Sequence, residues 1–175
     1  MNKHILFIQG GGEGGYEADK ELVGHSFGAS MIVKYISENS VTKKIAGIFL
    51  LATPFWHGNE DWQTGLKLQE NFADKLPDEV PIFFYHCQDD EQILFTHLDH
   101  YKQKLTQATF RELKKGGHQF NYDLALVAKD IKSLEVQSFI DSQLEANGKK
   151  LQQGIRKQIM KSIDIVQLLH EWKRE

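Results

Sequence analysis

The chain has 175 residues, of which 41% are hydrophobic and 26% charged, and its formal net charge is -3. This length and composition are typical of a globular protein that can bury a sizeable core. Because 21 basic residues stand against 24 acidic ones, no basic face for nucleic acid is expected. The composition therefore argues against a nucleic-acid partner held by a basic face.

The sequence carries neither a membrane segment nor a pattern of cysteines. No apolar run approaches the roughly 20 residues that cross a bilayer, and the first residues lead directly into a short strand pattern. The one cysteine, Cys87, cannot form an internal disulfide, which agrees with a reducing compartment. We interpret it as a small buried residue, since no nucleophile motif surrounds it. We therefore expect a cytoplasmic protein without a membrane partner.

Strand and helix patterns alternate along the first three quarters of the chain. Such alternation predicts an α/β fold with a mostly parallel sheet and helices on both faces. Ligands of such sheets bind outside the carboxyl ends of the strands. The expected strands are residues 3–9, 21–25, 45–51, 81–86 and 108–113, and the expected helices are residues 27–38, 95–106 and 121–133.

Five glycines lie between positions 10 and 15, directly after the first expected strand. The simplest interpretation is a flexible turn. A phosphate-binding loop is disfavoured, because the Lys-Ser/Thr pair of a P-loop and the ordered helix start of a dinucleotide fingerprint are both missing. A turn that offers backbone N-H groups to an anionic oxygen remains open.

The most informative motif is Gly24-His25-Ser26-Phe27-Gly28, which matches the G-x-S-x-G nucleophile elbow. A serine on a tight strand-to-helix turn needs small neighbours two residues away on either side, so that the backbone can bend and Oγ stays exposed. Ser26 is therefore the expected nucleophile.

An acidic residue and a histidine follow in the order that a serine triad requires. The expected strand 81–86 leads into Asp89 and Asp90, and the last expected strand leads into His118. Asp90 is the preferred acid and Asp89 the alternative. In this interpretation His118 takes the proton of Ser26, and the acid fixes the imidazole tautomer.

With these motifs in order, the chain resembles the α/β-hydrolase superfamily, most closely its small, lidless serine-hydrolase and esterase-like members. The resemblance implies an oxyanion hole formed by the backbone N-H groups of Gly11 and Phe27. It departs at the acid loop, where the family commonly has a proline and this chain has Ile93 and Leu94. The resemblance spans residues 3–133 and is carried by residues 5–12, 24–28, 50–56, 89–90 and 116–118.

The interval before the elbow is shorter than the resemblance implies. Neighbouring parallel strands need a crossover of about a dozen residues or more, yet only residues 11–20 separate Gly10 from Glu21. The family pattern would place two helices and a strand here, so about 50 residues are missing relative to it. A deletion of this size would be expected to misplace Ser26 and impair the activity.

Aromatic residues follow the third expected strand, where they could line an acyl pocket. These are Phe55, Trp56 and Trp62, although packing alone explains such residues about as often. His57, His97 and His100 lack a supporting carboxylate pattern, so no metal is expected.

The resemblance ends near Leu134, and residues 135–175 form a helical extension. We expect the α/β domain to span residues 1–134 and the extension to be broken at Asn147-Gly148. An amphipathic stripe follows this break, and it either packs on the domain or forms a homo-oligomer. The stripe consists of Leu151, Ile155, Ile159, Ile163, Val166 and Leu169.

These observations predict a serine hydrolase that cleaves an ester or related acyl substrate without a cofactor. Acyl transfer or perhydrolysis would use the same residues. The alternative is a catalytically impaired relative that acts as a binding or assembly module through its helical tail.

Overall fold

The computed structural model describes residues 5–9, 21–41, 45–58 and 61–172. The chain divides into two compact units, Met1–Ile131 and Lys132–Glu175, which are described separately. The division lies three residues before the expected domain end at Leu134. The residues that connect the first two strands, including the glycine-rich turn, lie outside the described part.

The first unit is built on a sheet of five parallel strands in the order β1-β2-β3-β4-β5. Every residue of β3 and β4 is buried, as expected for parallel strands covered on both faces. All four strand pairs are parallel, so the carboxyl ends of the five strands lie at one edge. The strands are β1 (Ile5–Gln9), β2 (Glu21–His25), β3 (Gly47–Leu51), β4 (Ile82–Cys87) and β5 (Thr109–Leu113).

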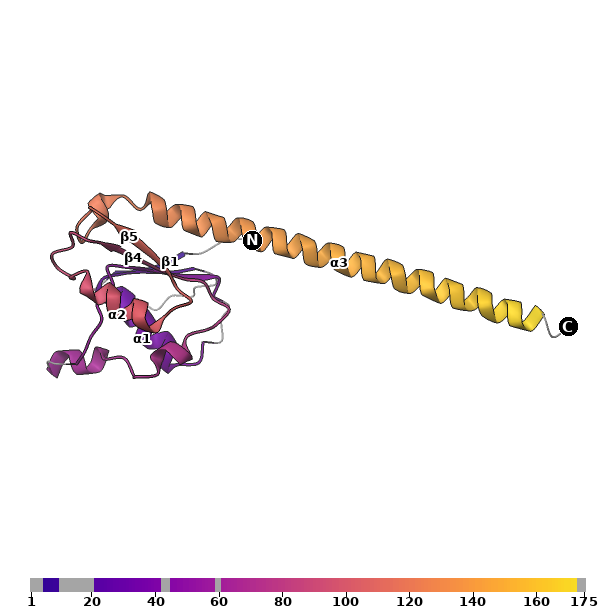
Figure 1. Cartoon of the computed structure of the whole chain (residues 1–175), viewed down its shortest axis with the longest axis horizontal. Helices are drawn as coiled ribbons and strands as arrows, with labels where there is room; N and C mark the ends of the chain where they lie inside the picture. Colours follow the sequence, from indigo (N-terminus) through magenta and orange to yellow (C-terminus); the bar gives the residue numbers. More distant parts are fainter. Residues whose placement is uncertain (1–4, 10–20, 42–44, 59–60, 173–175) are drawn as a thin grey trace. The chain divides into compact units, whose positions relative to one another are not determined.

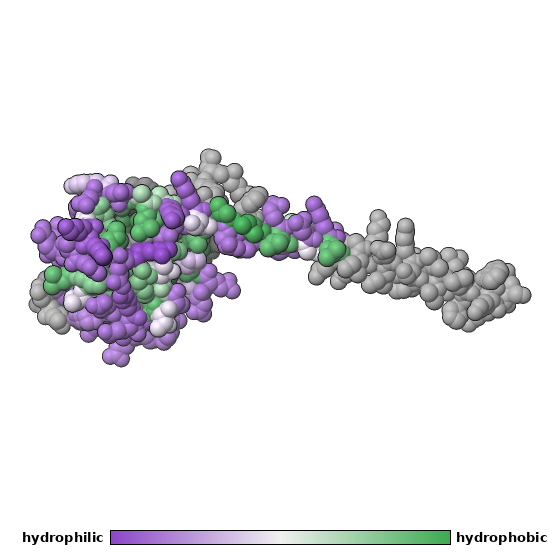
Figure 2. Space-filling model, turned by 45° about the horizontal axis from the view of Figure 1, so that its top comes forward, coloured by the Kyte–Doolittle hydropathy of each residue, from purple (hydrophilic) through white to green (hydrophobic). Residues whose placement is uncertain are grey.

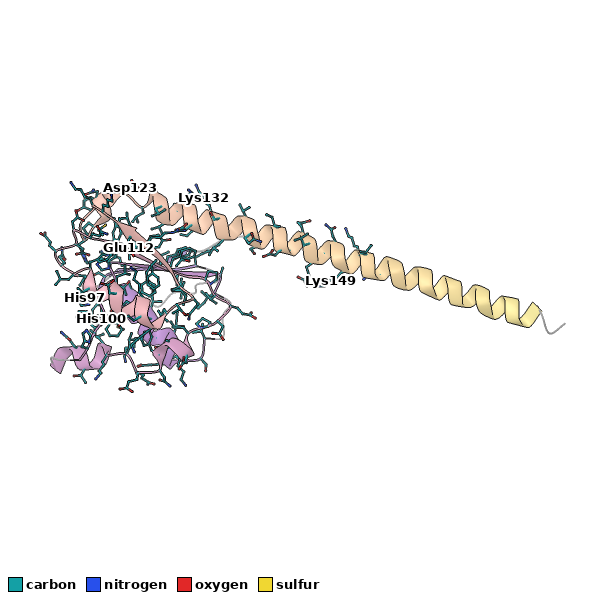
Figure 3. All side chains as sticks on the ribbon, in the orientation of Figure 1. His97, His100, Glu112, Asp123, Lys132 and Lys149 are labelled. Carbon is teal, nitrogen blue, oxygen red and sulfur yellow. The ribbon has the colours of Figure 1, made fainter. Side chains whose placement is uncertain are left out.

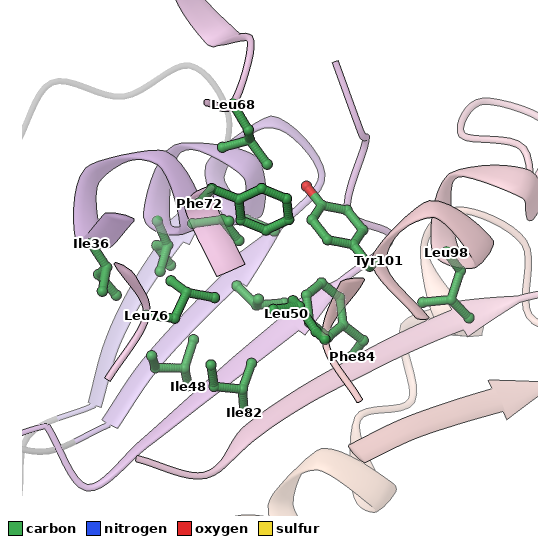
Figure 4. Close-up of a cluster of buried hydrophobic side chains, with 14 residues drawn as sticks. Ile36, Ile48, Leu50, Leu68, Phe72, Leu76, Ile82, Phe84, Leu98 and Tyr101 are labelled. Atoms are coloured by element: carbon green, nitrogen blue, oxygen red, sulfur yellow. The ribbon is translucent and has the colours of Figure 1, made fainter. Parts of the chain in front are cut away.

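One face of the sheet packs against α1 (Phe27–Glu38) and α2 (Thr96–Lys104), which lie on the same side of it in Figure 1. Right-handed crossovers between successive neighbours place all connecting helices on one face. The two helices enclose one hydrophobic cluster together with alternate residues of β3 and β4 (Figure 4). Its largest fully buried side chains include Leu50, Phe84 and Tyr101.

The opposite face carries the intervening residues of the same strands. Phe49 stacks on Phe83 with ring centroids 5.0 Å apart, and the Tyr85 hydroxyl donates a 2.8 Å hydrogen bond to Asp130. Arg111 donates two further hydrogen bonds to the carboxylate of Asp130, at 3.0 and 3.1 Å. Asp130 belongs to the first turns of α3 (Ala125–Trp172), so helices cover both faces, as the sequence predicted.

Most expected elements are confirmed to within two residues, but the segment between β3 and β4 was not predicted. It contains two short 3-10 helices, η1 (Asp61–Leu66) and η2 (Phe72–Lys75). Phe72 of η2 is buried in the core cluster. Because such short turns lack a full period of apolar residues, hydrophobic spacing does not reveal them.

The last helix differs from its expected bounds at both ends. It was expected at 121–133, but residues of η3 (Phe120–Tyr122) adopt positive φ angles, and α3 begins only at Ala125. There the side chain of Asp123 accepts a 2.9 Å hydrogen bond from the backbone N-H of Ala125. The predicted break at Asn147-Gly148 is wrong, because α3 continues through it. One glycine inside a helix costs only about 1 kcal/mol, which good helix-forming neighbours outweigh.

The second unit consists of the remainder of α3. Figure 2 shows hydrophobic patches along the helix. Four large apolar side chains of its described part are exposed: Val136, Ile140, Leu144 and Leu151. For the rest of the predicted stripe, from Ile155 to Leu169, only the backbone is described. Among the helices described, none is both long and apolar enough to cross a membrane.

Candidate active site

Ser26 occupies a strained turn between β2 and α1. Its backbone has φ 54° and ψ -125°, a conformation that costs a residue with a side chain about 1–3 kcal/mol. The turn is tied to the next strand by a 2.8 Å hydrogen bond from Ser26 N to the Leu51 carbonyl. The residue after that carbonyl, Ala52, also has a positive φ of 46°. Two strained residues thus lie side by side at the carboxyl edge of the sheet.

Gly24 allows α1 to begin directly against β2. A Cβ atom at this position would lie 2.6 Å from Ala29 Cα and 2.9 Å from Ala29 N, both backbone atoms of α1. Only a residue without a side chain therefore permits this approach. The requirement for a small residue before the serine, inferred from the motif, has a steric basis here.

His118 meets Ser26 across 92 residues of sequence. Its Nε2 lies 3.0 Å from Ser26 Oγ, and its Nδ1 lies 2.9 Å from Oδ2 of Asp90. A carboxylate only accepts hydrogen bonds, so Nδ1 carries the proton and Nε2 presents its lone pair to the serine hydroxyl. His118 and Asp90 are buried, whereas Ser26 is half-buried. The three side chains form one continuous chain of hydrogen bonds, and the short segment before the elbow does not separate them.

The two neighbouring acids have different partners. Asp90 binds His118 and accepts 2.9 Å hydrogen bonds from the backbone N-H groups of Gln92 and Ile93. Asp89 is exposed and accepts hydrogen bonds from Gly117 N at 2.9 Å and Gly116 N at 3.3 Å. These hydrogen bonds lower the pKa of Asp89, and the one from Gly117 contributes most. Asp90 therefore contacts the imidazole, and Asp89 holds the loop that carries it.

Phe27 is one of the two residues expected to form the oxyanion hole. Phe27 is the first residue of α1, where backbone N-H groups have no partner within the helix. Its N-H follows the strained serine directly, as an oxyanion donor requires. Gly11 lies outside the described residues.

The aromatic residues expected to contact a substrate differ in their neighbours. Phe55 is half-buried, and its ring contacts Phe72 and Tyr101 of the core as well as His57 and His100. Trp56 donates a 2.9 Å hydrogen bond from Nε1 to Ser30 Oγ, one helical turn after Ser26. The side chain of Trp62 lies outside the described part.

A groove of about 450 Å³ follows the outer side of α1 and was not foreseen. Phe27, Met31 and Tyr35 line it at intervals of four residues, and Tyr35 is 60% exposed. Their spacing shows that they share one side of the helix. Which side of α1 faces solvent depends on where the sheet packs against it, and the spacing of these residues does not determine that.

Other reactive side chains in the described part do not form a second centre. His97 and His100 both belong to α2 (Figure 3), and His97 Nδ1 accepts a 2.9 Å hydrogen bond from Phe55 N. The described residues include no group of three or more His, Cys, Asp or Glu side chains arranged to hold a metal ion. Burial raises the pKa of the Cys87 thiol to about 11, which disfavours a thiolate nucleophile.

Comparison with known proteins gives different results for the two units. A family model described as the Mu-like transposase middle domain matches residues 135–172, a part of α3 too small to define the family of the whole chain. No curated protein matches the sequence.

Solved structures resemble the described fold. The ydeN gene product of B. subtilis has 20% identity and a TM-score of 0.55, over 66% of this chain and 65% of that one. A bifunctional GH43-CE protein of Bacteroides eggerthii has 10% identity and a TM-score of 0.50, over 65% of this chain and 23% of that one. The esterase PF2001 of Pyrococcus furiosus has 12% identity and a TM-score of 0.46, over 67% and 52%.

This chain therefore spans at most about two thirds of the length of each of these proteins. The order of its parallel strands, the turn after β2 and the structural neighbours all indicate the same fold. The chain has an α/β-hydrolase-like fold.

Proposed function

We propose that this chain is a serine hydrolase that cleaves an ester or related acyl substrate through Ser26, His118 and Asp90. The observation that carries the proposal is the 3.0 Å contact between Ser26 Oγ and His118 Nε2, continued by the 2.9 Å contact from His118 Nδ1 to Asp90. A nucleophile next to a base that a third group orients is the signature of covalent acyl transfer.

The mechanism follows from the direction of these hydrogen bonds. Ser26 Oγ attacks the acyl carbon while its proton passes to His118 Nε2, and Asp90 stabilises the resulting imidazolium. The Phe27 N-H is placed to donate to the oxyanion that forms. When the tetrahedral intermediate collapses, the alcohol leaves with the proton from Nε2. A water then attacks the acyl carbon as it gives a proton to His118 Nε2, and His118 returns that proton to Ser26 Oγ as the acid leaves.

The test is labelling with a fluorophosphonate probe alongside hydrolysis of p-nitrophenyl acetate. We expect the protein to be labelled and to hydrolyse the ester, and Ser26→Ala to lose both, with a fall in kcat of up to about 10⁶-fold. Circular dichroism of both proteins controls for folding. Equal labelling of the folded protein and its Ser26→Ala variant would reject this function.

A second candidate function is assembly through the C-terminal helix. It is supported by four exposed apolar side chains on this helix, Val136, Ile140, Leu144 and Leu151. In this case a second copy of the chain covers these side chains. Light scattering of the full chain and of a version ending at Leu134 tests it. A larger mass for the full chain alone would support assembly, and a monomer in both would reject it.

A further inference from the structure

Two buried histidines that are not part of the Ser26, His118 and Asp90 hydrogen-bond chain lie at the carboxyl ends of strands next to it. His25 is the last residue of β2, and His86 is the last but one of β4. We propose that both are positioning residues: each donates a ring N-H to a backbone carbonyl in one of the two loops that hold the partners of Ser26. This inference rests on the proposed hydrolase function.

His25 positions the loop of the base. Its Nε2 lies 2.9 Å from the carbonyl oxygen of His118, and the two rings are 4.8 Å apart between centroids. A carbonyl only accepts, so Nε2 of His25 carries the hydrogen. Because His25 directly precedes Ser26, one strand end fixes both the nucleophile and the backbone of its base.

His86 positions the loop of the acid. Its Nε2 donates a 2.8 Å hydrogen bond to the carbonyl of Ile93, whose own N-H donates to Asp90 Oδ1 at 2.9 Å. Ile93 is thus held from both sides, and the same His86 nitrogen lies 3.6 Å from Oδ2 of Asp90. The loop therefore has one well-defined way to present its carboxylate to His118.

Both histidines fit this role best as neutral rings. Burial lowers the pKa of His25 and of His86. His25 faces His118 and Asp90, while His86 faces these two groups and Asp99. Within the described residues the buried Nδ1 of His86 has no hydrogen-bond partner, so a proton there would be unpaired. Neutral donors align the loops without adding positive charge beside the imidazolium of His118.

Paired variants separate positioning from packing. His25→Phe and His86→Phe keep a ring but lose the donor, whereas His25→Gln and His86→Gln keep an N-H that can reach the same carbonyl. We expect each Phe variant to lower kcat about 10- to 100-fold with little change in KM, because small misplacements of the triad cost that much. We expect the Gln variants to recover most of the rate.

A second measurement does not depend on turnover. Proton NMR reports the downfield hydrogen shared by His118 Nδ1 and Asp90, which we expect to persist in the wild type and the Gln variants and to weaken in the Phe variants. If the wild type shows this resonance but no Ser26-dependent labelling, the hydrolase proposal fails while positioning stands. Full kcat and an unchanged resonance in the Phe variants would overturn positioning. So would equal losses in the Phe and Gln variants.

Discussion

Contacts within the first unit join residues far apart in the sequence, whereas the described polar contacts of the second unit are local. Ser26 and His118 meet across 92 positions, and Tyr85 and Asp130 across 45. In α3 beyond Lys132, Gln137 bonds to Asp141 and Lys149 pairs with Glu145, each over one turn. The first unit thus depends on tertiary packing, and the second on helix propensity. Substitutions that disturb packing should therefore affect the site, and substitutions in the tail should not.

Among variants that keep the serine, the largest expected effect comes from replacing Asp90, with Asp89 as the comparison. Asp90→Asn should lower kcat for an ester on the order of 10⁴-fold, because an amide no longer favours the tautomer with the proton on His118 Nδ1. Asp89→Asn is the matched control and should cost about tenfold or less, since its remaining carbonyl still accepts a bond from Gly117 N. Steady-state kinetics of both variants measure this, and the reverse ranking would move the acid to Asp89.

Gly24→Ala should weaken both the fold and the site. Its Cβ would lie 2.6 Å from Ala29 Cα, so α1 must move away from β2. Overpacking of this kind costs about 1–3 kcal/mol of stability. A shift of Ser26 by about 1 Å would also lower the rate by up to about 10²-fold. Urea unfolding and ester hydrolysis test this, and wild-type values in both would show that the helix does not approach the strand so closely.

Acid should destabilise the first unit through two buried histidines, His25 and His86, and the half-buried His97. Burial lowers the pKa of His25, His86 and His97 in the folded state. Below about pH 6.5 the unfolded chain binds more protons than the folded one, so this stability is present above that pH and is lost as pH falls toward the folded pKa values. We expect a lower urea midpoint at about pH 5 than at about pH 7.5.

His86→Gln supplies the control for this pH effect, because it removes one of the three titrating rings while keeping a donor. Its urea midpoint should fall less between the two pH values than that of the wild type. A midpoint independent of pH in the wild type would contradict the burial of neutral histidines.

The smallest effect is expected in the tail. Gly148→Ala places a Cβ where no described atom lies within 4 Å, and alanine favours a helix over glycine by about 1 kcal/mol. Helix content by circular dichroism should therefore be equal or higher, with ester hydrolysis unchanged. A loss of turnover in this variant would show that the tail contributes to the site after all.

Local patterns determined much of the molecule. The glycines around Ser26 and the apolar strands follow from residue types at short spacing, and the structure contains the corresponding strands and turn. Each depends on neighbours within a few positions, so the sequence carries the whole signal. The same reasoning failed at Asn147-Gly148, because breaker residues indicate where a helix can end but do not force it to end there.

Only the tertiary structure decided which of two adjacent carboxylates meets the imidazole, and which side of α1 is open to solvent. It also brought the rings of His25 and His86 within hydrogen-bond distance of the carbonyls of His118 and Ile93. These properties arise when strands distant in the chain end at one edge of a sheet. Spacing along the chain does not encode them, because a one-residue difference in a loop places a side chain either in the core or in solvent.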